Sequence, residues 1–310
     1  MSAIGNESLK DFARQRHLES LTPQSLRAIV AGRTGYSVAR AQRFLAFRSR
    51  IDRELLCHRI IRANRYTAWF REGRQSLEQV RAFIVQFSVF SNQFLVAQLQ
   101  KVINADSLAG MRASKEILAN EIGVVFQSGR KAAAVTDPDR EGDPELVSTD
   151  GTVDGGVFRF RAAHFEWLLH IAEKLGLGFN DVGKRHHATP STLFFCDELV
   201  RLYGSEDYLT SQAASFAVEN WAAAGFWKEL IEGLTRFNEG SGMNLPLAFF
   251  TWHDRLEAQH ARHTQEELEK LWFERDVDED CFIRDGNCML DGVAAFWDGL
   301  DAQRRQLPSA

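Results

Sequence analysis

Three residues toward the C-terminus have the types and spacing of metal ligands. His253, Glu257 and His260 occupy positions i, i+4 and i+7 of a predicted helix. At about 100° per residue their directions fall within roughly 60° of one another, so the three side chains share one face. Phe249 and Phe250 flank that face, which indicates that it points toward the core. A carboxylate buried beside imidazoles is costly, and a metal cation compensates that cost best.

Imidazole and carboxylate ligands together suit iron, manganese or zinc. The alternative without a metal is a solvated helix face rich in His and Glu. This helix taken alone does not exclude that alternative. His263 lies about 80° away from the face and is not included.

Three further polar residues fall on apolar faces of other predicted helices. They are Glu121 in the helix expected over 107–126, His164 in that over 158–178 and Glu219 in that over 205–237. With the first three residues they make a set of three carboxylates and three imidazoles. Such a set matches two metal ions in a helical bundle, with one carboxylate bridging them. A buried network of hydrogen bonds is the metal-free alternative.

A period of about 3.6 residues between apolar positions predicts an all-α protein, without strands and without repeats. Helices are expected over 6–19, 22–35, 37–62, 76–102, 107–126, 158–178, 189–204, 205–237, 246–272 and 276–306, with 205–237 as one broken helix or two consecutive ones. Pro23 after Thr22 marks one helix start. The long apolar helix over 76–102 is expected to be central.

The segment 127–157 has no helical period and is dense in Gly, Asp and Pro, so we expect an inserted flexible loop or a lid over a site. We expect a single domain over 1–310. Its core covers about 75–272, preceded by N-terminal helices in 1–74 and followed by a C-terminal helix in 273–310.

Composition is that of an ordinary soluble protein, with 45% hydrophobic and 25% charged residues. No apolar run approaches the about 18 residues of a membrane span. The N-terminus has no apolar signal-peptide region, which favours the cytoplasm. The four cysteines form no paired motif, so we expect neither disulfides nor a zinc ribbon.

Charge is distributed unevenly along the chain. Residues 1–131 hold 21 Lys and Arg against 10 Asp and Glu, and residues 132–310 hold 16 against 32. The basic residues form no run, so we expect solvated helix faces rather than a nucleic-acid site. The alternative to solvated faces is that a basic surface packs against an acidic one, within the chain or across a homodimer.

The chain resembles the haem-oxygenase-like diiron oxidases and oxygenases, iron-containing redox enzymes related in fold to the TENA/PqqC proteins. The resemblance spans about 75–270. It is carried by NEIG at 120–123, AHFEWLLHIAEKLGLG at 163–178, AVENW around Glu219 and HDRLEAQH at 253–260. The last motif is the most specific.

The resemblance implies that Glu121, His164, Glu219, His253, Glu257 and His260 are iron ligands, with Glu219 as the bridging or mobile carboxylate of catalysis. It implies two ferrous ions per chain, with manganese as an alternative at one position, and O2 as co-substrate. An electron donor of unknown kind and a small, amino-acid-derived substrate complete the expectation. The reactions it suggests are N-oxygenation, desaturation and oxidative C–C cleavage in natural-product metabolism.

Two departures from the family pattern stand out. The first Glu and His usually lie close together in these enzymes, whereas 42 residues separate Glu121 from His164 here. We interpret 127–157 as an insertion that splits their helix. Glu257 also stands where many relatives carry Asp. The substrate pocket is expected beside the metals, walled by aromatic residues of 84–94 and by Trp221 or Trp252.

Two other functions compete with the diiron oxidase. A metal-free TENA-like enzyme would need a cysteine nucleophile, for which Cys196 is the candidate in the helical core. A non-enzymatic binding or regulatory protein would use the inward His and Glu as hydrogen-bonding groups.

Overall fold

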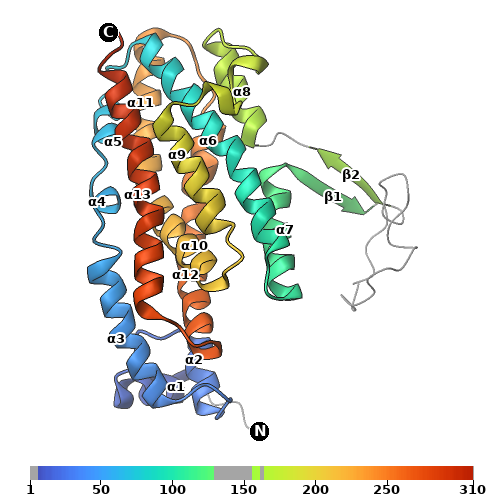
Figure 1. The fold of residues 1–310 in the computed structure, drawn as a ribbon, viewed down its shortest axis with the longest axis vertical. Coiled ribbons are helices and arrows are strands. Elements are labelled where there is room, and N and C mark those ends of the chain that lie inside the picture. Colours follow the sequence, from blue (N-terminus) through green and yellow to red (C-terminus); the bar gives the residue numbers. More distant parts are fainter. Residues whose placement is uncertain (1–5, 129–155, 161–163, 310) are drawn as a thin grey trace.

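The chain folds into a helical bundle (Figure 1), which confirms the predicted all-α class. The computed structural model describes residues 6–128, 156–160 and 164–309. Within these ranges the side chains of 6–7, 120, 124–128, 156–160 and 256–263 fall outside the described part.

Five helices make up the N-terminal section. They are α1 (Asn6–Arg16), α2 (Pro23–Val30), α3 (Val38–Glu54), α4 (Arg59–Arg62) and α5 (Arg65–Phe70). Thr22 caps α2 by accepting from the Ser25 amide, as its Thr-Pro start predicts. The single helix expected over 37–62 is wrong, because His58 starts a new helix by accepting from the amide of Ile60.

Helix α6 (Leu77–Ile103) lies at the centre and begins with a capping box formed by Ser76 and Gln79. It packs against α7 (Leu108–Glu121), α8 (His164–Lys174) and α9 (Pro190–Glu198). Among the described helices, α6 alone is long and apolar enough to cross a membrane, and half of its most apolar window is buried inside the protein. Its burial accounts for its apolar composition.

The C-terminal half supplies the rest of the bundle. A π-helical turn (Leu199–Tyr203) extends α9, and α10 (Tyr208–Ala222), α11 (Phe226–Ser241), α12 (Ala248–Glu274) and α13 (Glu279–Arg304) follow. Helices α6 and α12 run in the same direction, since Phe83 lies against Phe250 near their starts and Lys101 interacts with Glu267 near their ends. Helix α10 packs against both α12 and α13.

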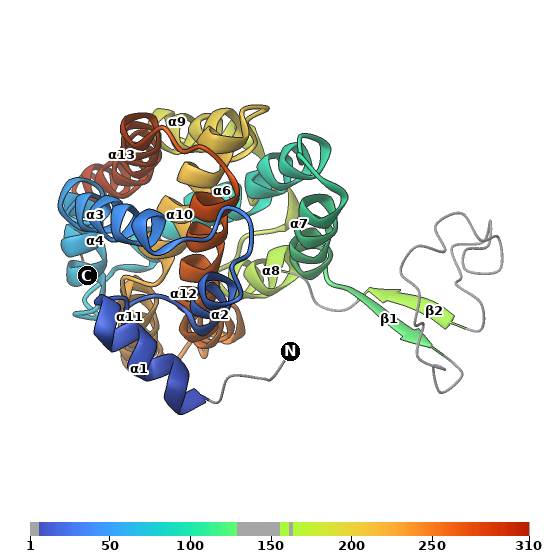
Figure 2. The same ribbon diagram turned by 90° about the horizontal axis from the view of Figure 1, so that it is seen from below.

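A two-stranded antiparallel ribbon contradicts the expectation of no strands. Strand β1 (Val124–Ser128) pairs with β2 (Gly156–Phe160), and the ribbon projects away from the bundle (Figures 1 and 2). The helices predicted over 107–126 and 158–178 were therefore too long. Periodicity cannot separate such short apolar runs from helix, and Gly123, at φ +68°, ends the preceding turn. The loop predicted over 127–157 lies outside the described residues from 129 to 155.

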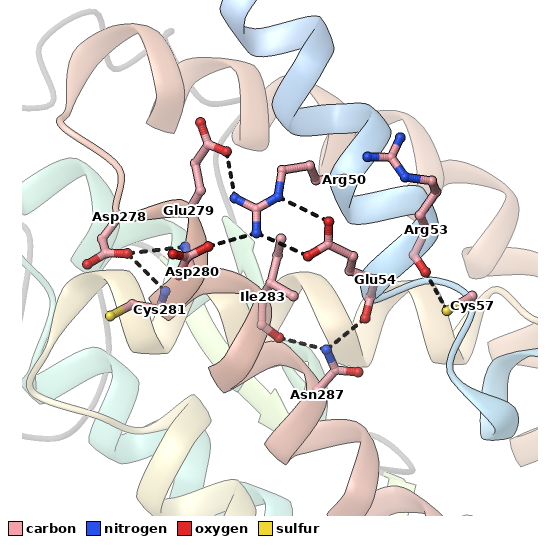
Figure 3. A network of polar contacts seen from close by, with 10 residues as sticks. All are labelled: Arg50, Arg53, Glu54, Cys57, Asp278, Glu279, Asp280, Cys281, Ile283 and Asn287. Atoms are coloured by element: carbon pink, nitrogen blue, oxygen red, sulfur yellow. Dashed lines mark hydrogen bonds and ion pairs between the residues drawn. The ribbon is translucent and has the colours of Figure 1, made fainter.

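Polar contacts join the N-terminal helices to the bundle. Figure 3 shows Arg50 of α3 between Glu54 of its own helix and Glu279 and Asp280 at the start of α13. Glu269 of α12 is fully buried and accepts from both the amide and the hydroxyl of Thr22. These bonds fix α2 and α3 against α12 and α13.

Candidate metal centre and its cavity

A cavity of about 610 Å³ lies within the bundle, bordered by residues of α6, α7, α10 and α12. Four of the six predicted metal ligands line it: Glu121, His164, Glu219 and His253. The other two, Glu257 and His260, belong to α12, and their side chains lie outside the described residues. The four lining residues come from four helices, α7, α8, α10 and α12, and border the same cavity.

Glu121 and His164 are in direct contact despite their separation in sequence. Oε2 of Glu121 lies 2.6 Å from Nδ1 of His164. Glu121 is the last residue of α7 and His164 the first of α8. The antiparallel ribbon between them explains the contact, because pairing Val124 with Phe160 returns the chain to the point it left.

The contact fixes the tautomer of His164. A carboxylate accepts hydrogen bonds, so Nδ1 carries a proton, and in the neutral imidazole Nε2 then carries the lone pair. The residue is only 4% exposed, and Nε2 is buried without a hydrogen-bond partner among the described residues. Leaving such an atom unsatisfied is costly, and a metal ion would satisfy it.

His253 repeats this arrangement on α12. Its Nδ1 lies 2.7 Å from the carbonyl oxygen of Phe249, which can only accept, so Nδ1 is again the donor. The rings of His164 and His253 are 4.6 Å apart between centroids, and Trp227 stacks on His253 at the same distance. In metal sites the ligating imidazole typically donates its other N–H to a carboxylate or carbonyl, as both rings do here.

Aromatic side chains wall the cavity, as the sequence predicts for 84–94 and Trp221. Phe87, Phe90 and Phe94 of α6 and Trp221 of α10 line it. Trp252 instead packs edge-on against His164, with ring centroids 4.8 Å apart. The aromatic wall limits the water available around the imidazoles.

The described side chains do not by themselves form a complete metal site. Among them, no group of three His, Cys, Asp or Glu is arranged to hold a metal ion. Glu257 and His260 are not part of that set, and they are two of the three proposed ligands in the most specific motif. The donors that are described, two imidazoles and two carboxylates, fit iron or manganese, and the buried Nε2 of His164 fits a ligand position.

Sequence reasoning missed a second polar group in the same cavity. Nζ of Lys101 lies 2.6 Å from Oγ of Ser215 and 4.1 Å from the ring centroid of Tyr203. Burial lowers the pKa of Lys101 to about 8, while the charges of Glu267 and Glu219 oppose that shift. The sequence did contain a signal for Glu267, which also lines the cavity. It follows His260 by seven residues, as His260 follows His253, so the spacing predicts that the three lie along one side of α12.

Cys196, the nucleophile required by the metal-free alternative, does not line the cavity. It is 1% exposed. Burial raises the pKa of its thiol to about 12. Reactive cysteines are partly exposed thiolates, so this sulfur has the environment of a structural cysteine.

The sequence matches no known family model and no curated protein. A helical fold does not define an activity, because one fold hosts many unrelated functions. The function is therefore inferred from the side chains of the cavity.

Proposed function

We propose that the protein is a non-haem diiron oxidase or oxygenase with a haem-oxygenase-like fold, which uses O2 to oxidise a small, amino-acid-derived metabolite. The iron ligands would be Glu121, His164 and Glu219, together with the α12 triplet His253, Glu257 and His260. The observation that carries the proposal is the pair of imidazoles, His164 and His253, with rings 4.6 Å apart at one cavity.

The two rings come from different helices and make the same kind of hydrogen bond through Nδ1. Each directs its Nδ1 to a fixed acceptor, Glu121 for one and the Phe249 carbonyl for the other. In the neutral form of each ring the lone pair is therefore on Nε2, the nitrogen that would bind a metal. Ligating imidazoles typically donate their other N–H to a carboxylate or a carbonyl, and both rings do so here.

Bound ferrous ions would supply the activation of O2. The protein's part is to hold the donors and to shape the space beside them. Glu219, which lines the cavity from α10, would be the bridging or mobile carboxylate. The Phe87, Phe90 and Trp221 walls keep the site apolar and leave a cavity of about 610 Å³ for a small substrate.

The proposal is tested by titrating metal-free protein anaerobically with ferrous iron. Wild type should bind two irons per chain, and addition of O2 should then produce a visible absorption band. His164→Ala and His253→Ala should each reduce the number of irons bound and abolish the band. His170→Ala is the matched control, because His170 is exposed on the same helix as His164.

Circular dichroism of each variant checks that the bundle is intact. Folded wild-type protein that binds no iron, or that loses as much iron with His170→Ala as with His164→Ala, would overturn the proposal.

A further inference from the structure

We infer that the cavity holds a carboxylate-binding site formed by the Lys101 ammonium and the Ser215 hydroxyl, which binds the acid group of a substrate with an apolar body. These residues come from α6 and α10 and line the same cavity as the imidazoles. They have no place in the metal centre proposed above.

Lys101 has hydrogen-bonding capacity to spare. An ammonium group has three donors, and Ser215 Oγ, at 2.6 Å, takes one of them. The ring of Tyr203 stabilises the charge from one side at 4.1 Å. No carboxylate in the described part of the chain forms an ion pair with Lys101, although Glu219 and Glu267 act on it from farther away.

The surroundings leave the charge of Lys101 incompletely compensated. Burial is the largest influence on this group and disfavours its charged form. At pH 7 the ammonium nevertheless remains mostly protonated, because its pKa of about 8 is higher. A carboxylate bound here would restore the missing countercharge through a charge-assisted hydrogen bond.

The site lies toward the open side of the cavity. Glu267 and Lys270 of α12, which also line the cavity, are exposed to solvent. His253 lies two heptads before Glu267, about 21 Å along the helix axis at 1.5 Å per residue. An acid group at Lys101 would thus remain near solvent, while the apolar body of the ligand points inward to Phe90, Phe94 and Trp221.

Resting on the proposed function, this site also defines which atom of the substrate is oxidised. Glu219 follows Ser215 by one turn of α10, about 6 Å along the axis. A substrate anchored at Ser215 and Lys101 would therefore pass Glu219 and extend toward His253, so the carbon presented to the metal centre would lie on its apolar body, remote from the carboxylate. The reaction would take place on the body of the molecule and leave the acid group in place.

The test measures ligand binding by calorimetry on metal-free protein at pH 7. The probes are 3-phenylpropionate and its neutral analogue 3-phenylpropionamide. Wild type should bind the carboxylate at least tenfold more tightly than the amide. Lys101→Met should abolish that preference while still binding the amide. Lys270→Met, which removes an exposed lysine from the same cavity, should leave the preference unchanged.

Equal binding of the two probes to wild type, or no binding of either, would overturn the inference even if Lys101→Met failed to fold. A preference that survives in Lys101→Met, or that Lys270→Met removes, would overturn it as well. Because no iron is present, a positive result would stand if the chain proved not to bind iron. Iron binding without the carboxylate preference would leave the proposed function intact.

Discussion

The carboxylate of Glu121 and the imidazole of His164 lie 2.6 Å apart, although 42 residues lie between them in the sequence. The ends of α7 and α8 meet because the ribbon of β1 and β2 closes the intervening chain. This pair gives one histidine of the cavity a defined tautomer and a buried nitrogen without a hydrogen-bond partner among the described residues. The contact thereby orients one of the two imidazoles on which the candidate centre depends.

We expect Glu121→Ala to destabilise the metal-free protein by about 1–3 kcal/mol, because it leaves the buried Nδ1–H of His164 without its acceptor. Urea denaturation followed by circular dichroism measures the change. Iron affinity should also fall, by about 10- to 100-fold, whether the carboxylate binds iron or orients His164. Glu116→Ala, at an exposed position of the same helix, should change stability by less than about 0.5 kcal/mol.

An unchanged free energy of unfolding in Glu121→Ala would contradict the contact. An equal loss of stability in Glu116→Ala would show that the change comes from altering the helix and not from removing the Glu121–His164 contact.

Much of this site could be predicted from helical periodicity. The inward direction of His164 and the outward direction of His170 follow from the apolar stripe of α8 and agree with their burial. The all-α class follows from the same signal, since most helices are long enough to show several turns of it. The end of α7 at Glu121 and the start of α8 at His164 could not be predicted from periodicity, because short apolar runs fit either a strand or a helix.

Lys101 could not be recognised from local pattern, whereas the seven-residue spacing from His253 and His260 pointed to Glu267. A charged residue at the edge of an apolar stripe is usually solvated, with its stem on the protein and its charged end in water. What distinguishes Lys101 is that its nitrogen faces a cavity between α6 and α10, which depends on how distant helices pack. Sequence periodicity carries no information about that space.

Lys101→Met should stabilise the protein at neutral pH. The folded-state pKa of Lys101 is about 8, against 10.5 for an ordinary lysine. Between these values the unfolded state binds more protons, so wild-type stability rises with pH across this window, whereas the variant has no group to titrate there. The variant should be more stable by about 1–3 kcal/mol at pH 7, reduced from the full shift because the group borders open space.

Urea denaturation of both proteins at pH 7 and pH 10.5 measures this difference. The advantage of Lys101→Met should shrink at the higher pH. An advantage that grows with pH would mean that the charge of Lys101 is favourable in the folded state.

Cys196 should resist alkylation in the folded protein. Its thiol is buried, and its pKa of about 12 leaves almost no thiolate at pH 8. Treatment with iodoacetamide followed by peptide mass spectrometry should modify the exposed Cys57 and spare Cys196 until denaturant is added. Rapid modification of Cys196 in native protein would revive the metal-free cysteine enzyme as an explanation, and Cys196→Ser would then be the variant to assay.

Glu269→Ala should loosen the N-terminal section from the bundle. It removes the acceptor of the Thr22 amide and hydroxyl at a fully buried position. We expect a loss of about 2–3 kcal/mol, in line with hydrogen bonds to a charged group. Limited proteolysis should then cut more readily before α3, whereas Glu266→Ala, at an exposed position of α12, should digest like wild type.

The most direct test of the diiron proposal is anomalous diffraction at the iron absorption edge, from crystals soaked anaerobically with ferrous iron. We predict two peaks in the cavity. Nε2 of His164 and the side chains of the α12 triplet should lie within bonding distance of these peaks. Both peaks should weaken in His253→Ala crystals. Full-occupancy iron elsewhere with none beside His164, or no iron in crystals whose bundle is intact, would contradict the account.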